Sequence, residues 1–307
     1  MIEARSLTKA YGDKKAVDEI SFTVRPGRVT GFLGPNGAGK STTMRMIVGL
    51  DAPTSGSVTV NGLPYQRHRA PLREVGVLLD AKAVHPSRSA RAHLLALAAT
   101  HGITAARVGE VIEMTGLGSV AGKRVGAFSL GMGQRLGIAA ALLGDPSTVI
   151  LDEPVNGLDP EGVIWVRGLA RSLAAEGRTV FLSSHLMSEM SQTADHLIVI
   201  GRGRILADAP IQDILRAGSG ATTTVRADRP LELAALLTGR GAEVRIEGGG
   251  ELSVTELPPR AIAETALAAG VLVYELVPRR TSLEEAYLEL TKNEVEYQSL
   301  VLAGEER

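Results

Sequence analysis

One stretch of the chain reads Gly31-Phe32-Leu33-Gly34-Pro35-Asn36-Gly37-Ala38-Gly39-Lys40-Ser41-Thr42, and the fold is organised around it. At the start of this stretch, Val29–Leu33 has the apolar character of a short buried strand. After them, Lys40–Val48 carries apolar residues at helical spacing. The segment between matches G-x-x-x-x-G-K-S, the pattern of a phosphate-binding loop between a strand and a helix. We therefore predict an α/β fold that binds a nucleoside phosphate at this loop.

The residue types of this loop suit the binding of phosphate. Gly34, Gly37 and Gly39 allow the backbone to close around an anion without Cβ clashes. Successive N–H groups and the N-terminus of the following helix then point at the phosphates. Lys40 adds a point charge for the β and γ phosphates, and the Ser41 hydroxyl can bind Mg²⁺. The other loop residues that we predict to contact the nucleotide are Pro35, Asn36, Ala38 and Thr42.

The composition limits the functions that are open to the chain. Its 307 residues are enough for one large domain and a smaller one, and 44% of them are apolar. The formal net charge of −1 argues against a nucleic-acid partner held by a basic surface. The chain has no cysteine, which excludes disulfides, zinc fingers and thiol catalysis. We find no apolar signal segment and no apolar run near the roughly 18 residues of a membrane span, so we expect a soluble, cytoplasmic protein.

Two carboxylates follow an apolar strand later in the chain. Thr148–Leu151 has the pattern of a buried strand, and Asp152 and Glu153 come directly after it. An acid at the carboxyl end of such a strand can hold Mg²⁺, and its neighbour can orient water. A further β-rich strand, Thr179–Ser184, delivers His185 at its carboxyl end. Downstream of a phosphate-binding loop, these residues indicate a second element of the nucleotide site.

The order of the elements predicts how the first domain, residues 1–216, is organised. Residues 1–30 alternate like two or three strands. A short strand at Arg73–Leu79 leads into a mainly helical insertion, which we place at about 81–145. Strands and helices then alternate, which implies a largely parallel core sheet with crossover connections.

The pattern resets after residues 216–220, which are rich in glycine. The order that follows is strand, helix, two strands, helix and strand, which is the ferredoxin-like arrangement. Ser282-Leu283-Glu284-Glu285 is a capping box for one more helix. No catalytic constellation occurs here. We expect residues 221–307 to form a small α+β accessory domain that is regulatory or contacts a dimer partner, with an inert extension as the alternative.

Taken in order, these motifs resemble the ATP-binding cassette family, and in particular the ATPase subunit of a drug-exporter-like transporter. Gly34–Ser41 matches the Walker A loop, and Val149–Asp152 with Glu153 matches the Walker B strand and its catalytic acid. Asn156–Asp159 is similar to the D-loop, whose Asp159 the resemblance places near the nucleotide. His185 occupies the position of the switch histidine.

The signature motif of the family is matched with two departures. Residues 128–132 read Phe-Ser-Leu-Gly-Met, so that Leu130 and Met132 replace the usual glycine and glutamine. Ser129 and Gly131 are retained. The resemblance implies that these two residues face the γ-phosphate of a nucleotide held by the partner subunit.

Two residues outside these motifs also enter the predicted site. Tyr11 matches the adenine-stacking aromatic of the family, although its residue type alone fits packing on the sheet equally well. Asp80 stands where the family usually has the Q-loop glutamine. We predict that it reaches Mg²⁺ through water or alters coupling to the membrane partner, and the alternative is a simple cap of the next helix.

The resemblance implies an ATP-hydrolysing subunit that drives efflux of a drug-like or lipid-like substrate through a separate integral-membrane permease. Two copies would form a homodimer around two ATP molecules, each bound by the loop of one copy and the signature of the other. Glu153 would polarise the attacking water, His185 would hold the γ-phosphate, and Lys40 with Mg²⁺ would offset its charge. Such a subunit lies at the inner face of the cell membrane and binds no nucleic acid.

Three other interpretations compete with this one. A P-loop GTPase or small-molecule kinase is disfavoured, because the chain lacks an Asn-Lys-x-Asp motif and would not need the signature. A non-transport cassette protein would carry two cassettes or a long coiled-coil insertion, and this chain has neither. A regulatory subunit without full activity stays open because of Asp80, and an ATPase assay separates it from the others.

Overall fold

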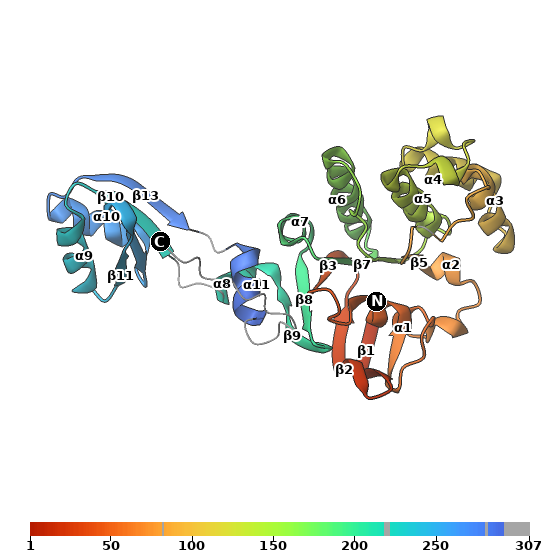
Figure 1. The fold of residues 1–307 in the computed structure, drawn as a ribbon, viewed down its shortest axis with the longest axis horizontal. Helices are drawn as coiled ribbons and strands as arrows, with labels where there is room; N and C mark the ends of the chain where they lie inside the picture. Colours follow the sequence, from red (N-terminus) through yellow and green to blue (C-terminus); the bar gives the residue numbers. More distant parts are fainter. Residues whose placement is uncertain (82, 218–221, 280–281, 292–307) are drawn as a thin grey trace, which may run out of the picture. The chain divides into compact units, whose positions relative to one another are not determined.

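The computed structural model describes residues 1–81, 83–217, 222–279 and 282–291 (Figure 1). Contacts between residues divide the chain into two compact units, Met1–Pro210 and Ile211–Leu290. The domain limits expected from the sequence, at residues 216 and 221, stay predictions. We describe each unit by itself.

The first unit is built on a six-stranded sheet in the order β5-β6-β7-β3-β8-β9. All neighbours are parallel except β9, which runs antiparallel to β8, so the predicted mostly parallel core sheet is confirmed. Every residue of β6, β7 and β8 is buried, as is typical of parallel strands that are covered on both faces. The strands are Arg28–Leu33 (β3), Val75–Leu78 (β5), Thr148–Leu151 (β6), Thr179–Ser184 (β7), His196–Gly201 (β8) and Arg204–Pro210 (β9).

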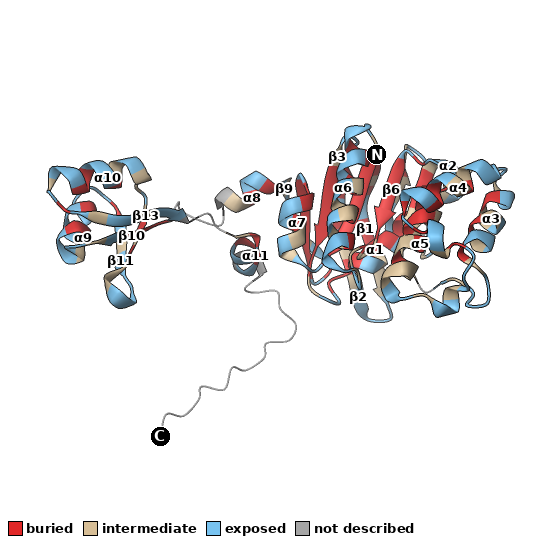
Figure 2. Cartoon of the chain, turned by 90° about the horizontal axis from the view of Figure 1, so that it is seen from above, coloured by how far each residue is buried: buried red, intermediate tan, exposed pale blue. Residues whose placement is uncertain are grey.

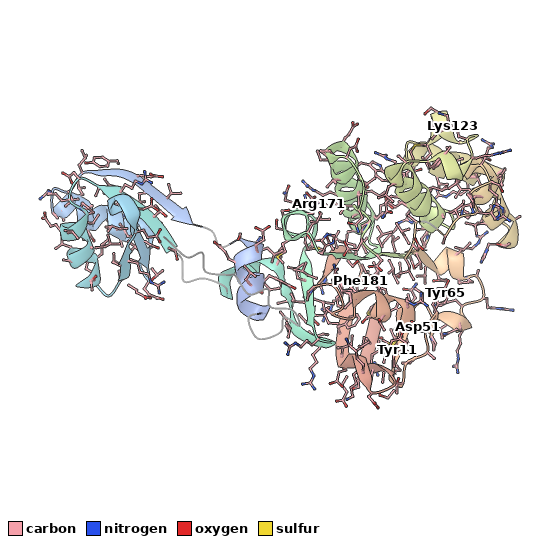
Figure 3. The ribbon with its side chains drawn as sticks, viewed as in Figure 1. Tyr11, Asp51, Tyr65, Lys123, Arg171 and Phe181 are labelled. Atoms are coloured by element: carbon pink, nitrogen blue, oxygen red, sulfur yellow. The ribbon has the colours of Figure 1, made fainter. Side chains whose placement is uncertain are left out.

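A second, antiparallel sheet in the order β2-β1-β4 confirms the predicted N-terminal strands. It consists of Ile2–Tyr11 (β1), Lys14–Val24 (β2) and Ser55–Val60 (β4). Three aromatic rings, Phe22, Phe32 and Phe181, pack together from β2, β3 and β7, with ring centroids 5.2 to 6.0 Å apart. Figure 3 labels Phe181. Because the rings come from both sheets, they join the two layers in one buried core (Figure 2).

The predicted helical insertion is observed as α3, α4 and α5, whose buried side chains include Leu94, Val108 and Ile138. Each of these helices begins at a Ser or Thr whose side chain accepts a hydrogen bond from the first turn. The helices of the first unit are Lys40–Ile47 (α1), Pro71–Glu74 (α2), Ala90–Thr100 (α3), Ala105–Met114 (α4), Leu130–Leu142 (α5), Pro160–Ala175 (α6) and Met187–Thr193 (α7). Short 3-10 turns lie at Tyr65–Arg67, Gly118–Val120 and Val125–Ala127.

One predicted strand begins too early. We expected Arg73–Leu79 to be extended, but Pro71–Glu74 forms the short helix α2 and the strand β5 begins only at Val75. Pro71 stands in the first turn of α2, where its fixed φ suits a helix and its missing N–H is not needed. The apolar run of β5 therefore has a helical turn before it.

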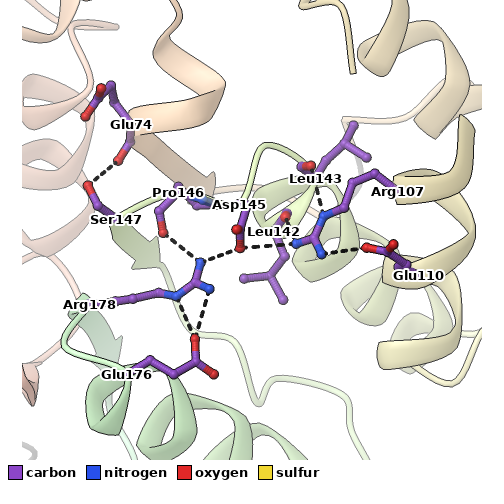
Figure 4. Close-up of polar contacts among 10 residues, drawn as sticks. All are labelled: Glu74, Arg107, Glu110, Leu142, Leu143, Asp145, Pro146, Ser147, Glu176 and Arg178. Carbon is purple, nitrogen blue, oxygen red and sulfur yellow. Dashed lines mark hydrogen bonds and ion pairs between the residues drawn. The ribbon is translucent and has the colours of Figure 1, made fainter. Parts of the chain in front are cut away.

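Asp145 joins the helical insertion to the core (Figure 4). Its backbone is left-handed, with φ of 55°, three residues after the end of α5 and directly before Pro146. One carboxylate oxygen, Oδ1, lies 3.4 Å from a guanidinium nitrogen of Arg107 on α4 and 2.8 Å from one of Arg178, which precedes β7. Arg107 and Arg178 also donate to backbone carbonyls at the end of α5 and before β6. This corner therefore fixes where α4 and α5 meet the sheet.

The second unit contains a four-stranded antiparallel sheet in the order β11-β12-β10-β13. Together with two helices, this order confirms the predicted ferredoxin-like arrangement. The capping box is also present, because Ser282 and Glu285 exchange side-chain to backbone hydrogen bonds of 2.9 and 3.2 Å. Its elements are Ile211–Ala217 (α8), Thr222–Ala227 (β10), Pro230–Thr238 (α9), Glu243–Ile246 (β11), Leu252–Thr255 (β12), Pro259–Ala268 (α10), Val273–Arg279 (β13) and Leu283–Thr291 (α11).

Candidate active site

The phosphate-binding loop joins β3 to α1 and borders a cavity of about 210 Å³. Two of its glycines have a left-handed backbone, with φ of 81° at Gly37 and 108° at Gly39. A Cβ on Gly39 would lie 2.5 Å from the backbone oxygen of Ala16, so only glycine allows this close approach. The cavity is lined by Ala16, Pro35, Asn36, Gly37, Gly39, Lys40, Ser41, Thr42 and Glu153. The loop residues present thus fit a group of phosphates held by backbone N–H groups.

Two predicted loop residues lie outside this lining. Gly34 packs so closely on the backbone of Ile200 that a side chain would collide with it. Ala38 is buried, and its backbone N–H donates to Pro35 while its carbonyl accepts from Gly203. These two residues shape the loop from behind.

Lys40 points its ammonium group into the loop. Its side chain is 7% exposed, and Nζ donates hydrogen bonds to the carbonyls of Gly34 at 2.6 Å and Pro35 at 3.2 Å. Burial lowers the pKa of the Lys40 ammonium, and the carboxylates of Glu153 and Asp152 act in the opposite direction. Nζ lies 4.0 Å from Oε1 of Glu153. The loop therefore holds a cation at the place where phosphate oxygens would enter.

Glu153 lies where β6 has ended, and several groups fix it. Its backbone is left-handed, with φ of 48°, a conformation that costs a non-glycine residue about 1–2 kcal/mol. The backbone of Glu153 is held from two sides, because Nε2 of Gln134 donates to its carbonyl at 3.0 Å and its N–H donates to Oγ of Ser183 at 2.9 Å. These bonds offset the backbone strain and aim the carboxylate.

His185 approaches the same carboxylate from the neighbouring strand. β6 and β7 are parallel neighbours, so the residues that follow them meet at one edge of the sheet. Nδ1 of His185 lies 2.8 Å from Oε2 of Glu153, and its imidazole is 45% exposed. The structure therefore brings together Lys40, Glu153 and His185, the three residues that we predicted to be catalytic.

The signature and D-loop residues form a separate surface. Ser129 is the N-cap of α5, where Oγ accepts from the N–H of Met132 at 3.2 Å, and Asp159 caps α6 in the same way. Gly131 lies against the D-loop, since a Cβ there would be 3.1 Å from the carbonyl oxygen of Gly157. Ser129, Gly131 and Asp159 are absent from the lining of the loop cavity, and their contact with nucleotide stays a prediction.

Comparison with known proteins identifies the family. The family model described as ABC transporter matches residues 17–156. The bacitracin transport ATP-binding protein BcrA of Bacillus licheniformis is 44% identical over 217 residues, which cover 70% of this chain and 71% of that protein. This chain belongs to the family of ABC transporter ATP-binding proteins. It is the ATP-binding, ATP-hydrolysing subunit of an ABC transporter, as the motifs predicted, and the relatives give no support to a role outside transport.

Two further comparisons extend this result. The Nod factor export ATP-binding protein I of Rhizobium sp. (strain N33) is 35% identical over 303 residues and spans 96% of this chain and 98% of that protein. A solved dimeric ATP-binding cassette, in a post-hydrolysis state with ADP and Pi, has the same fold with a TM-score of 0.63 at 23% identity. It covers 69% of this chain and 99% of its own. A second family model, a domain of unknown function, matches residues 221–284.

In this ABC ATPase, Tyr11 lies at the end of β1 and is 53% exposed. Its hydroxyl donates to Oδ2 of Asp51 at 3.2 Å (Figure 3). Nζ of Lys9 lies 5.0 Å from its ring centroid. Burial and the Asp51 carboxylate raise the pKa of the Tyr11 hydroxyl. Tyr11 is not among the residues that line the loop cavity, so adenine stacking by this ring stays a prediction.

The predicted metal ligands of this ABC ATPase lie on separate elements. Ser41 is in the first turn of α1 and lines the loop cavity, Asp152 follows β6, and Asp80 lies two residues beyond the end of β5. Among the described residues, no three His, Asp or Glu side chains gather closely enough to hold a metal ion by themselves. A hydroxyl and a carboxylate beside a phosphate cradle fit Mg²⁺ that shares its ligands with phosphate oxygens. Within the described ranges, no helix has the length and apolar character of a membrane span.

Two residues at this site were not assigned a role from the sequence. Gln134 and Ser183 are both buried and hold the backbone of Glu153. Gln134 follows the signature on α5, and Ser183 comes two residues before His185, so their positions beside known motifs were the available signal.

Proposed function

We propose that this ABC ATPase drives export of a drug-like or lipid-like substrate through a separate integral-membrane permease. Two relatives support this, because their names describe bacitracin transport and Nod factor export. An ATP-binding subunit of this family is held at the membrane by its contact with the permease. We therefore place this chain on the cytoplasmic side, at the inner face of the membrane. The permease selects the cargo.

One observation carries the hydrolytic part of the proposal. The carboxylate of Glu153 lies between Nζ of Lys40 at 4.0 Å and Nδ1 of His185 at 2.8 Å, at the edge of the phosphate-binding cavity. A carboxylate held in this way is suited to act as a general base. Glu153 accepts a proton from water, whose oxygen then bonds to the γ-phosphorus. The bond from that phosphorus to the β–γ bridging oxygen breaks, which gives ADP and phosphate.

The chain's own groups position the triphosphate. The backbone N–H groups of the loop and the ammonium of Lys40 bind the β and γ phosphates and offset their charge. His185 keeps the carboxylate of Glu153 oriented and lies exposed enough to contact the γ-phosphate. Ser41 and Asp152 would hold Mg²⁺, with Asp80 reaching it through water. When bound, Mg²⁺ neutralises charge on the β and γ oxygens.

A homodimer completes the site in this proposal. Ser129 is exposed at the N-terminus of α5, although neither it nor Gly131 lines the cavity at the phosphate-binding loop of its own chain. The N-terminus of a helix favours an anion, and α5 presents one beside these two residues. A second copy could therefore place its Ser129 and Gly131 at the γ-phosphate held by the first. A solved cassette with the same fold is dimeric, which supports the homodimer in this proposal.

The second unit is proposed as a regulatory or dimer-contacting module, with its boundary at residues 216–221. It has a hydrophobic core of its own, in which Val225, Leu233 and Ile262 are fully buried. A chain truncated after Arg216 should still bind ATP but change its basal hydrolysis or its association state. Unchanged hydrolysis and association would leave an inert extension as the explanation.

The export proposal is tested in inverted membrane vesicles in which this chain is produced together with a candidate permease from the same organism. Vesicles with the wild-type chain should accumulate bacitracin when ATP is added, whereas vesicles with Glu153→Gln should not. Accumulation that is equal in the two preparations, or absent in both for bacitracin and for a panel of amphipathic drugs, would contradict export of this substrate class.

A further inference from the structure

We propose that Ser183 is a positioning residue that orients Asp152 and Glu153 and thereby sets the affinity of the site for Mg²⁺. This inference rests on the proposed function, since it assigns a role toward the same Mg²⁺–ATP site. Ser183 is the next-to-last residue of β7 and is fully buried. It does not line the loop cavity, so its effect on nucleotide has to pass through its neighbours.

The hydroxyl of Ser183 makes two bonds, and together they fix its orientation. Oγ accepts a hydrogen bond from the backbone N–H of Glu153 at 2.9 Å. The same oxygen lies 2.5 Å from Oδ1 of Asp152, and a carboxylate oxygen can only accept, so the single hydroxyl proton goes to Asp152. A hydroxyl with both roles occupied cannot rotate away without losing a charge-assisted bond.

The place of this hydroxyl in the sheet explains why it is needed. The register of β6 and β7 runs in parallel from Thr148 opposite Thr179 to Leu151 opposite Leu182, and β6 ends there. One position further along the chain, the N–H of Asp152 points away from β7 and toward β5, where it donates to the carbonyl of Leu78 at 2.7 Å. The side chain of Ser183 then bonds the next N–H, that of Glu153, in place of a backbone carbonyl. The two strand ends stay joined where Glu153 adopts its left-handed backbone.

This arrangement leaves one oxygen of Asp152 for a metal. Oδ1 accepts from Ser183, while Oδ2 makes no hydrogen bond or ion pair within the described residues. A buried donor that occupies one oxygen fixes the plane of the carboxylate and so the direction of the other. Removal of such an outer partner typically costs about 10–100-fold in metal affinity or activity. Ser183 is thus an outer hydrogen-bond partner of Asp152: it orients the carboxylate that we predict to bind the metal.

The test measures binding rather than turnover. We would titrate the purified full-length chain with a fluorescent, non-hydrolysable ATP analogue, once in excess Mg²⁺ and once in EDTA, and compare the two dissociation constants. For Ser183→Ala we expect the gain in affinity from Mg²⁺ to fall by about 10-fold. The affinity in EDTA should stay within about twofold of the wild-type value, because Lys40 and the loop are unchanged.

Two further variants control for packing. Thr30→Val removes a buried hydroxyl from the neighbouring strand β3, and this hydroxyl has no partner in the described chain, so the Mg²⁺ effect should stay at the wild-type value. Ser183→Thr keeps the hydroxyl and should recover most of the Mg²⁺ effect. Circular dichroism of each variant checks that it is folded.

The outcomes separate this inference from the proposed function. A wild-type chain that binds no analogue would overturn the nucleotide site and the role of Ser183 together. A wild-type chain that binds with a clear Mg²⁺ effect, beside a folded Ser183→Ala variant with the same effect, would overturn the role of Ser183 alone. A loss of equal size in Mg²⁺ and in EDTA would also overturn it, because it would reflect damaged packing.

Discussion

Nδ1 of His185 lies 2.8 Å from Oε2 of Glu153, across the ends of two neighbouring parallel strands. The other oxygen of that carboxylate, Oε1, lies 4.0 Å from Nζ of Lys40. A base has to lie within hydrogen-bond reach of the proton that it takes, and its orientation has to be fixed. Here an imidazole and an ammonium group hold the carboxylate from two sides while its backbone is strained. The catalytic part of the account depends on this arrangement.

Lys40→Ala should weaken ATP binding roughly 10- to 150-fold, the equivalent of about 1.5–3 kcal/mol for a charge-assisted hydrogen bond. The reason is that Lys40 supplies the cation inside the loop, where its side chain is 7% exposed. Fluorescence titration with a labelled ATP analogue measures the change. The matched control is Lys123→Ala, which removes an exposed lysine from the helical insertion and should leave affinity unchanged (Figure 3). Equal affinities for wild type and Lys40→Ala would remove Lys40 from the site.

Much of the fold follows from local patterns, and the places where prediction fails have physical reasons. The alternation of strands and helices predicted a largely parallel core sheet, and glycine and serine positions marked the loop and the capping box. The start of β5 was misplaced because Arg73 and Glu74 carry no signal against a strand, whereas Pro71 begins a helical turn. The rule that was overlooked is the preference of proline for the first turn of a helix.

The candidate site was predictable only in part. The residue types and order gave Lys40, Glu153 and His185, and the structure brings these together. The supports of Glu153 were not assigned a role from the sequence, because Gln134 and Ser183 bind its backbone and their only signal was a position beside a known motif. The left-handed φ of Glu153 is likewise invisible before the structure is known. Sequence patterns therefore identify the side chains that act in catalysis more readily than the residues that position those side chains.

Substitutions of Asp80 test the departure from the family pattern in the Q-loop, where the usual residue is glutamine. If Asp80 reaches Mg²⁺ through water, Asp80→Gln should give equal or higher ATPase activity, because it restores the usual residue. Asp80→Ala should lower the apparent affinity for Mg²⁺ several-fold, as loss of an outer ligand does. The measurement is the rate of phosphate release as a function of Mg²⁺ concentration. Curves that superimpose for the wild type and both variants would assign Asp80 to a structural role outside the site.

His93 on α3 should make the fold less stable in acid. Burial and the nearby Arg88 lower the pKa of His93 below its usual 6.5, and its Nδ1 is buried without a hydrogen-bond partner in the described chain. The unfolded chain therefore binds the proton more readily, so stability falls as the pH drops from about 6.5 through the folded-state pKa. His93→Gln should reduce this loss in urea unfolding at pH 5 relative to pH 7.5. His85→Gln, an exposed control, should keep the wild-type pH dependence, and a His93 variant that also keeps it would refute the assignment.

Asp145 offers a test of the corner between the helical insertion and the core. Asp145→Asn removes the negative charge from the two arginine contacts but tolerates the left-handed backbone, and because the side chain is 61% exposed we expect a loss of only about 0–1 kcal/mol. Asp145→Ala loses the contacts and strains the backbone at φ of 55°, which adds about 1–2 kcal/mol. Urea unfolding should therefore rank the wild type first, the Asn variant second and the Ala variant last. An Ala variant as stable as the Asn variant would argue against an energetic cost of the left-handed backbone at residue 145.

The most direct test of the whole account is the rate of phosphate release from ATP by Glu153→Gln beside the wild-type chain. The substitution keeps the shape of the side chain and removes its ability to accept a proton. We predict that turnover falls by roughly 10²–10⁴-fold while ATP affinity is retained. Size-exclusion chromatography with ATP should then show a trapped nucleotide-bound dimer. Near-normal phosphate release by the folded variant would contradict the assignment of Glu153 as the base, and with it the proposed mechanism.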